Sequence, residues 1–214
     1  MPSTARSAPR DPGGAQRILD AAERLFAERG FDAVAVTEIA AQAGVSKANV
    51  FHHFGSKREL YVAAVRAACQ QTTALLAPDG GPGEAVRTRL GRFLAGHLEH
   101  VHERAGLTRL VVRELLEPGH NGAQELAEKA FGDGFERLVS LIREGQASGE
   151  LRSEADPAAA ALLMIGANVF FFQSRALLPH LPGVDFADDP AAYTRAVTDL
   201  LFRGLADDAS GRDE

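Results

Sequence analysis

The stretch from residue 36 to residue 60, VTEIAAQAGVSKANVFHHFGSKREL, constrains the fold more than any other part of the chain. Apolar residues recur at helical spacing over its first two turns, so they can bury one face of a short helix. Gly44 then supplies the positive φ angle that a sharp helical stop needs, and Ser46 is a favourable N-cap for a second helix. Val50 and Phe54 share one face of that second helix. The stretch therefore predicts two short helices joined by a tight turn.

The outward positions of the second helix carry hydrogen-bond donors, a methyl group and aromatic edges. In a helix-turn-helix the second helix enters the major groove of DNA with its N-terminal residues first. Lys47, Ala48 and Asn49 lie at that end of the helix, and His52 follows one turn later. We therefore expect these four side chains to carry base selectivity.

The charge distribution agrees with a DNA-facing surface in this stretch. The chain has a net charge of −6, which by itself is unusual for a DNA-binding protein. Residues 1–60, however, hold 8 Lys and Arg against 7 Asp and Glu, whereas residues 61–214 hold 15 against 22. No Asp or Glu occurs between residues 39 and 58. The basic side chains expected to form a local positive face there are Lys47, His52, His53, Lys57 and Arg58.

At these residues the chain resembles the TetR/AcrR family of bacterial transcriptional regulators. The pattern IAxxAGVSKxxxFxHFxSKxEL, carried from Ile39 to Leu60, is close to the family signature. The resemblance covers roughly the first third of the chain. It implies an all-α protein with an N-terminal three-helix DNA-binding domain and a C-terminal helical domain that dimerises and encloses a ligand cavity.

The resemblance also implies individual DNA contacts, with two departures. His53 and Lys57 match residues that contact phosphate in the family, whereas Phe51 replaces a tyrosine whose hydroxyl does so. Ala35 replaces a hydroxyl-bearing cap, which leaves Glu38 as half of a capping box. Thr37 is expected to substitute in part at the phosphate, and Arg17 is expected near a helix N-terminus that attracts phosphate. The full expected contact set is Arg17, Thr37, Ser46, Lys47, Ala48, Asn49, Phe51, His52, His53 and Lys57.

Helix signals continue along the rest of the chain and predict about nine helices without β-strands. Residues 1–14 are rich in Pro, Gly, Ser and Arg and are expected to be a disordered arm, either solvated or touching DNA through Arg6 and Arg10. We expect the DNA-binding domain over residues 15–60, the ligand-binding and dimerisation domain over 61–208, and a disordered tail over 209–214. The expected helices span about 16–29, 36–43, 47–54, 57–76, 84–103, 106–116, 123–148, 158–178 and 191–206.

Two of these helices predict a homodimer. The helix over 158–178 is apolar on nearly its whole circumference, so it must be covered on more than one side. The last helix presents a second broad apolar face, which includes Leu200 and Leu201. Two such helices from each subunit would form a four-helix interface. A homodimer also suits a palindromic operator, whose half-sites lie about 34–36 Å apart.

Met164, Asn168, Phe171 and Phe172 are the expected ligand contacts. They mix aromatic, soft and amide groups on the helix that should border the interior, which is the composition of a site for a small, largely apolar organic ligand. Ordinary core packing explains the same residues, and the sequence leaves both interpretations open. The ligand and the cavity follow from the family layout alone.

The remaining signals argue against other classes of protein. The single cysteine, Cys69, indicates a reducing cytoplasm, and no signal peptide is expected. The apolar run from 158 to 172 falls short of the ~20 residues of a membrane span. His97, His100 and His102 are expected to face solvent, although a metal site with a further ligand stays open. We expect no catalytic residue, cofactor or metal. The interpretation that competes with a transcriptional regulator is an all-α enzyme or protein-binding module.

Overall fold

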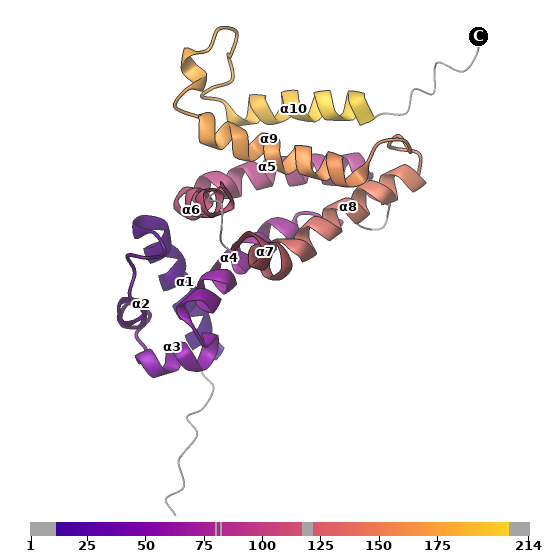
Figure 1. Ribbon diagram of the computed structural model, residues 1–214. Helices are drawn as coiled ribbons and strands as arrows, with labels where there is room; N and C mark the ends of the chain where they lie inside the picture. The colour runs from indigo at the N-terminus through magenta and orange to yellow at the C-terminus, as the bar shows by residue number, and fades with distance from the viewer. Residues whose placement is uncertain (1–11, 80, 82, 117–121, 206–214) are drawn as a thin grey trace, which may run out of the picture.

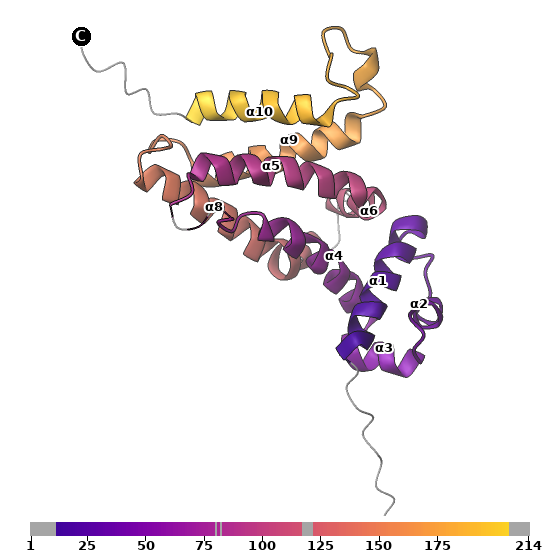
Figure 2. The same cartoon turned by 180° about the vertical axis from the view of Figure 1, so that it is seen from behind.

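The computed structural model describes residues 12–79, 81, 83–116 and 122–205, and within these residues every regular element is helical (Figures 1 and 2). Because α7, a π-helix and α8 run on as one rod, the described part holds nine helical rods, which confirms the expected fold class. The elements are α1 (Pro12–Arg29), α2 (Val36–Ala43), α3 (Lys47–Phe54), α4 (Lys57–Ala74), α5 (Val86–Glu103), α6 (Ala105–Leu116), α7 (Gly122–Leu126), π-helix η1 (Ala127–Phe131), α8 (Gly132–Ala147), α9 (Pro157–Ser174), 3₁₀ turn η2 (Leu178–His180) and α10 (Pro190–Leu205).

The helix starts follow the N-cap residues of the sequence. The Ser46 hydroxyl accepts a hydrogen bond from the Asn49 amide at 3.1 Å and begins α3. Ser56 does the same for α4, where it accepts from the Glu59 amide at 3.0 Å. Asp156 accepts from two amides at the start of α9, with a proline at the first helical position. Each cap satisfies amides that have no partner inside the helix.

Two helix boundaries differ from the sequence prediction. α1 begins at Pro12, so residues 12–14 of the expected arm are helical; proline suits a first helical turn because it lacks only an N–H that needs no partner there. α9 ends at Ser174 rather than near residue 178; the chain continues through turn residues into the 3₁₀ turn η2, which contains Pro179. The rest of the expected arm and the expected tail over 209–214 lie outside the described residues.

The segment predicted as one helix over 123–148 contains an irregular turn. α7 passes into the π-helix η1 at Ala127 and returns to α-helix at Gly132. η1 packs against α4. A π turn places an extra residue within a helix. Such turns are rare and are frequently found at functional sites.

Two main hydrophobic cores organise the molecule. Figures 1 and 2 show α1–α3, here called the head, at one end; α5, α8, α9 and α10 stack at the other end, and α4 runs between them. The first core fills the head but also includes Tyr61 and Val65 of α4, Leu107 of α6 and Leu126 of α7. The expected domain boundary after residue 60 therefore cuts through a continuous core. The second core joins α5, α8, α9 and α10, here called the body together with α6 and α7.

One side of α9 lies open. α9 packs on α5 and α8, which bury Ala161, Met164 and Asn168. Its 18 residues have a mean hydropathy of 1.4, which meets the minimum for a membrane-crossing helix by length and composition. Packing of one face into the second core is equally typical of a core helix in a folded domain. Leu162, on the opposite face, is 65% exposed.

Candidate DNA-binding site

The turn between α2 and α3 is fixed by its backbone. Gly44 has a φ of +66°, in the left-handed region, and its amide donates to the Ala41 carbonyl at 3.2 Å. The Val45 amide then donates to the Ala40 carbonyl at 3.0 Å, which closes the end of α2. Val50 is 2% exposed and anchors α3 in the head core. This geometry confirms the helix-turn-helix predicted from the sequence.

An aromatic cluster supports the motif from behind. Phe26 of α1 meets the edge of Tyr61 of α4, with the ring centroids 5.7 Å apart. Phe31 packs on both rings from the α1–α2 connection, at 5.7 Å from Phe26 and 5.4 Å from Tyr61. Aromatic pairs at these separations add to the free energy of simple burial. The cluster thus holds α1 and α4 together beneath α3, the helix expected to contact DNA bases and here called the reading helix.

The structure exposes most of the expected DNA contacts. The α3 positions Lys47, Ala48 and His52 are exposed, and Phe51 is 39% exposed although it is apolar. The Lys47 ammonium lies 5.7 Å from the centre of the Phe51 ring, one helical turn away. Thr37 and Ser46 are also exposed, whereas Asn49, His53 and Lys57 are half-buried.

Arg17 lies in a different setting from the expected one. Because α1 begins at Pro12, Arg17 is in the second turn of the helix and is not beside its unpaired amides. Its Nε donates to the Ala43 carbonyl at 3.3 Å, at the C-terminal end of α2. Arg17 therefore ties α1 to α2, and a phosphate contact of this residue stays a prediction.

The two basic residues at the start of α4 point in different directions. Lys57 donates to the Asp32 carbonyl at 3.3 Å and lies 4.5 Å from the centre of the Phe31 ring, on the side of the head. Arg58 turns inward and pairs with Glu114 of α6 at 2.6 Å and Glu125 of α7 at 2.7 Å. Arg58 consequently does not contribute to the expected positive face, because two carboxylates neutralise it.

Glu38, the acidic residue of α2, is also neutralised by local partners. Glu38 accepts a hydrogen bond from the Ala35 amide at 2.8 Å, which confirms the half capping box. Arg29 pairs with the same carboxylate at 2.7 Å. These two donors, the Ala35 amide first, lower the pKa of Glu38. The carboxylate therefore stays ionised but paired beside the reading face.

The residues expected to contact a ligand lie inside the body. Met164, Phe171 and Phe172 are buried on α9, and Asn168 is fully buried. The Asn168 amide nitrogen lies 2.8 Å from the Leu94 carbonyl and 3.0 Å from Nδ1 of His97, both on α5. The Asn168 Oδ1 atom is buried without a hydrogen-bond partner. The ligand assignment stays a prediction, since core packing also involves these side chains.

The expectation that three histidines face solvent was wrong, because His97, His100 and His102 are all half-buried. His97 stacks on Phe93 at 5.5 Å, and burial lowers its pKa to about 4. His102 packs against Phe172 and lies 3.3 Å from an Arg175 guanidinium nitrogen. His100 contacts the Gly96 carbonyl within its own helix. Within the described ranges, no three His, Cys, Asp or Glu side chains are arranged to hold a metal ion.

Sequence reasoning missed the ion pairs that join the head to the body. Arg58 of α4 finds its two carboxylates more than fifty residues further along the chain. Arg104, between α5 and α6, pairs with Glu23 of α1. No local pattern signals such pairs, because their partners become neighbours only when the helices pack.

Sequence comparisons identify the family. The family described as bacterial regulatory proteins, tetR family, matches residues 18–64, which run from α1 into α4. The HTH-type transcriptional regulator YdeS of Bacillus subtilis is 32% identical over 158 residues, which cover 71% of this chain and 74% of YdeS. The chain belongs to the TetR family. The HTH-type transcriptional repressor NicS of Pseudomonas putida is 26% identical to this TetR-family chain over 193 residues, covering 88% of the chain and 90% of NicS.

Solved structures show the same fold. The transcriptional regulator FadR from Bacillus subtilis, solved in complex with stearoyl-CoA, superposes with a TM-score of 0.71 at 22% identity and covers 88% of this chain and 98% of its own. The relatives named here are transcriptional regulators and not enzymes. This TetR-family chain is accordingly a DNA-binding transcriptional regulator, and the competing interpretation as an enzyme is set aside.

Proposed function

We propose that this TetR-family regulator is a cytoplasmic homodimeric repressor. It binds a palindromic operator through α3 of each subunit and is released when a small, largely apolar organic ligand occupies the body. The observation that carries the proposal is the exposed surface of α3, where Lys47 and Ala48 in the first turn and His52 one turn later project from a well-anchored helix. Those positions are the ones from which a recognition helix reads base edges.

The open faces of α9 and α10 support the dimer. Leu162, Leu163 and Phe170 on α9 are 65%, 62% and 70% exposed, and Leu200 on α10 is 73% exposed. A clustered apolar surface of this kind marks an interaction site in a soluble protein. Leu201, which the sequence placed on the same interface, is half-buried and packs on the second core instead. We therefore assign the interface to the outward residues of both helices, here called the α9–α10 face.

The buried polar pair of the body supports a ligand. Asn168 offers an unpartnered carbonyl oxygen among apolar side chains, beside His97. A few polar groups in an apolar setting are typical of small-molecule sites. FadR from Bacillus subtilis, which shares this fold, was solved with stearoyl-CoA bound. The proposed contacts remain Met164, Asn168, Phe171 and Phe172, with a population shift of the dimer as the response to the ligand.

Two further observations support repression and a cytoplasmic location. NicS, which matches most of this chain, is named as a repressor. Cys69 is a free, half-buried thiol, and its burial raises its pKa to about 11, so it remains protonated and unreactive. A free thiol of this kind suits a reducing compartment.

A footprint tests the proposal directly. The full-length protein should protect a palindromic segment in the DNA that flanks its own gene, with two protomers bound per segment. A promoter controlled by that segment should become active when the gene for the protein is deleted. Absence of any protected segment, or promoter activity that requires the protein, would contradict the repressor assignment.

The first prediction concerns base selectivity. Asn49→Ala should weaken binding to the protected segment by about 1–3 kcal/mol and leave binding to scrambled DNA nearly unchanged, because a base contact exists only on the cognate sequence. Its backbone amide keeps the Ser46 cap, so α3 should stay folded. Gel-shift titrations on both DNAs provide the measurement. Equal losses on both would make Asn49 a positioning contact.

The second prediction concerns phosphate contact. Lys57→Ala should weaken binding to all DNA and reduce the magnitude of the slope of log K against log salt by about one. The reason is that the variant neutralises one phosphate fewer and therefore releases fewer counterions on binding. Arg143→Ala provides the control, because it removes the same charge from an exposed position on α8. The salt dependence of both variants would be measured on cognate and scrambled DNA. A slope that matches the control would show that Lys57 does not reach a phosphate.

A further inference from the structure

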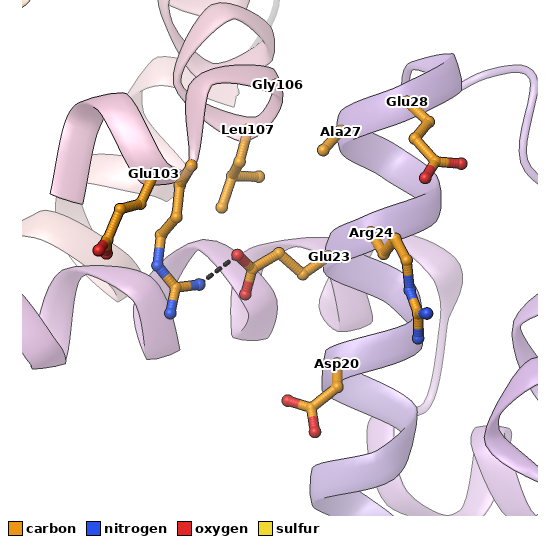
Figure 3. Close-up of a pocket in the computed structure, with 9 residues that line it drawn as sticks. Asp20, Glu23, Arg24, Ala27, Glu28, Glu103, Gly106 and Leu107 are labelled. Carbon is orange, nitrogen blue, oxygen red and sulfur yellow. Dashed lines mark hydrogen bonds and ion pairs between the residues drawn. The ribbon is translucent and has the colours of Figure 1, made fainter.

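The N-terminal end of α6 packs directly on α1. Figure 3 shows the corner where α5 passes into α6, facing α1 across an open groove of about 650 Å³. Ala27 of α1 and Gly106 of α6 are among the residues that line that groove. This corner is a direct contact between the head and the body.

Gly106 is required at this contact by space. A Cβ atom on Gly106 would lie 2.6 Å from both the Cβ and the carbonyl oxygen of Ala27. Two of the three nearest atoms belong to the α1 backbone, so no side-chain rotation would relieve the overlap. Any larger residue must move α1 away from α6. The backbone of α6 therefore approaches α1 more closely than a side chain permits.

An ion pair fixes the same corner. The Arg104 guanidinium pairs with the Glu23 carboxylate on α1, as the dashed line in Figure 3 marks. Its other terminal nitrogen donates to Gln71 Oε1 on α4 at 2.7 Å. Both members of the ion pair are about three-quarters buried, with 22% and 24% of their side chains exposed. One arginine thus joins the body to α1 and to α4.

The other end of α6 is attached to α4. Glu114 lies two residues before the end of α6 and pairs with Arg58 at 2.6 Å. Arg58 also pairs with Glu125 of α7. The two helices that support the reading helix from behind are therefore each fixed to α6, α1 at its start and α4 near its end.

We propose that the α6 seat, made by Gly106, Ala27 and the Arg104–Glu23 ion pair, sets the orientation of the head on the body and thereby the half-site spacing that the dimer reads. Gly106 and Arg104 are positioning residues: they act through α1 and do not touch DNA. In a dimer, a tilt at the seat moves each reading helix relative to its partner, because the body is the fixed frame. This inference rests on the proposed dimer and its palindromic operator.

Gly106→Ala is the sharpest test, because alanine favours the helix itself and only the seat opposes it. Gly91→Ala on α5 is the matched control, since its Cβ would meet nothing closer than Thr198 at 3.9 Å. Both variants would be titrated on the operator, on a single half-site duplex, and on operators with one base pair added or removed between the half-sites. We expect Gly106→Ala to lose about tenfold or more on the operator, to keep its half-site affinity, and to change its preferred spacing. Unchanged spacing preference and operator affinity would overturn the proposal.

A second variant covers the case in which Gly106→Ala does not fold. Glu23→Gln removes the ion pair without changing shape, and it should reduce the ratio of affinities between the native and altered spacings. The exchange Glu23→Arg with Arg104→Glu should restore that ratio. If Glu23→Gln keeps the native ratio, the seat does not control spacing. Wild-type protein that binds no palindrome would instead contradict the proposed function, so the two failures are distinguishable.

Discussion

Leu200→Glu should convert the dimer into a folded monomer and lower operator affinity by about 100-fold or more, because the monomer loses the effective concentration of the second head. Leu200 is 73% exposed on α10, so the glutamate is harmless in one subunit. In the α9–α10 face it would be buried without a partner, at a cost of several kcal/mol. Light scattering, circular dichroism and a gel-shift titration on the same sample would measure mass, helix content and affinity.

Leu116→Glu is the matched control for this prediction. Leu116 is 76% exposed at the end of α6, so the substitution adds the same charge to a similarly exposed leucine outside the α9–α10 face. We expect that variant to remain dimeric with nearly normal affinity. A dimeric Leu200→Glu protein would place the interface elsewhere, and a monomer that still binds the palindrome tightly would rule out two-headed reading.

Acidification should destabilise the protein before its carboxylates titrate. Burial and the neighbouring His100 lower the pKa of His97 to about 4, against an ordinary value of 6.5. Between these two values the unfolded chain binds a proton that the folded chain refuses, so the free energy of unfolding falls as pH decreases from 6.5 to 4. The total loss from this residue is about 3 kcal/mol. It is absent at neutral pH, where both states are uncharged.

Denaturant unfolding between pH 7 and pH 4.5 would measure this loss. His97→Gln removes the titrating ring and keeps an acceptor for the Asn168 amide, so its stability should depend less on pH than that of the wild type. His100→Gln on the same helix is the comparison variant. A pH dependence of His97→Gln equal to that of the wild type would show that His97 is not the buried group responsible.

Local signals in the sequence predicted local structure well. The Gly44 turn and the cap at Ser46 depend on residues within three or four positions, and each formed as expected. The same applies to the order of the helices. These features are predictable because a backbone amide without a partner is satisfied by the nearest suitable side chain.

Features that depend on packing were not predictable from the sequence. Arg58 lies in a stretch without acids, yet α6 and α7 bring Glu114 and Glu125 to it. His97 lies on a helix with polar neighbours, and its burial follows from the approach of α9. On α10, Leu200 and Leu201 are adjacent and chemically identical, so only the packed structure shows which one faces outward. The DNA and ligand contacts stay predictions for the same reason.

The π turn gives the α7–α8 rod two phases. Before it, Leu126 belongs to the core of the head; after it, Leu138 and Ile142 belong to the core of the body. Deleting one residue from this turn would shorten the rod by only about 1.5 Å but rotate everything beyond it by about 100°. One of the two cores would then face solvent. The extra residue therefore rotates the second part of the rod relative to the first, so that a single rod contributes side chains to both cores. In an alignment of related chains, the helical periodicity should be counted separately on either side of this turn.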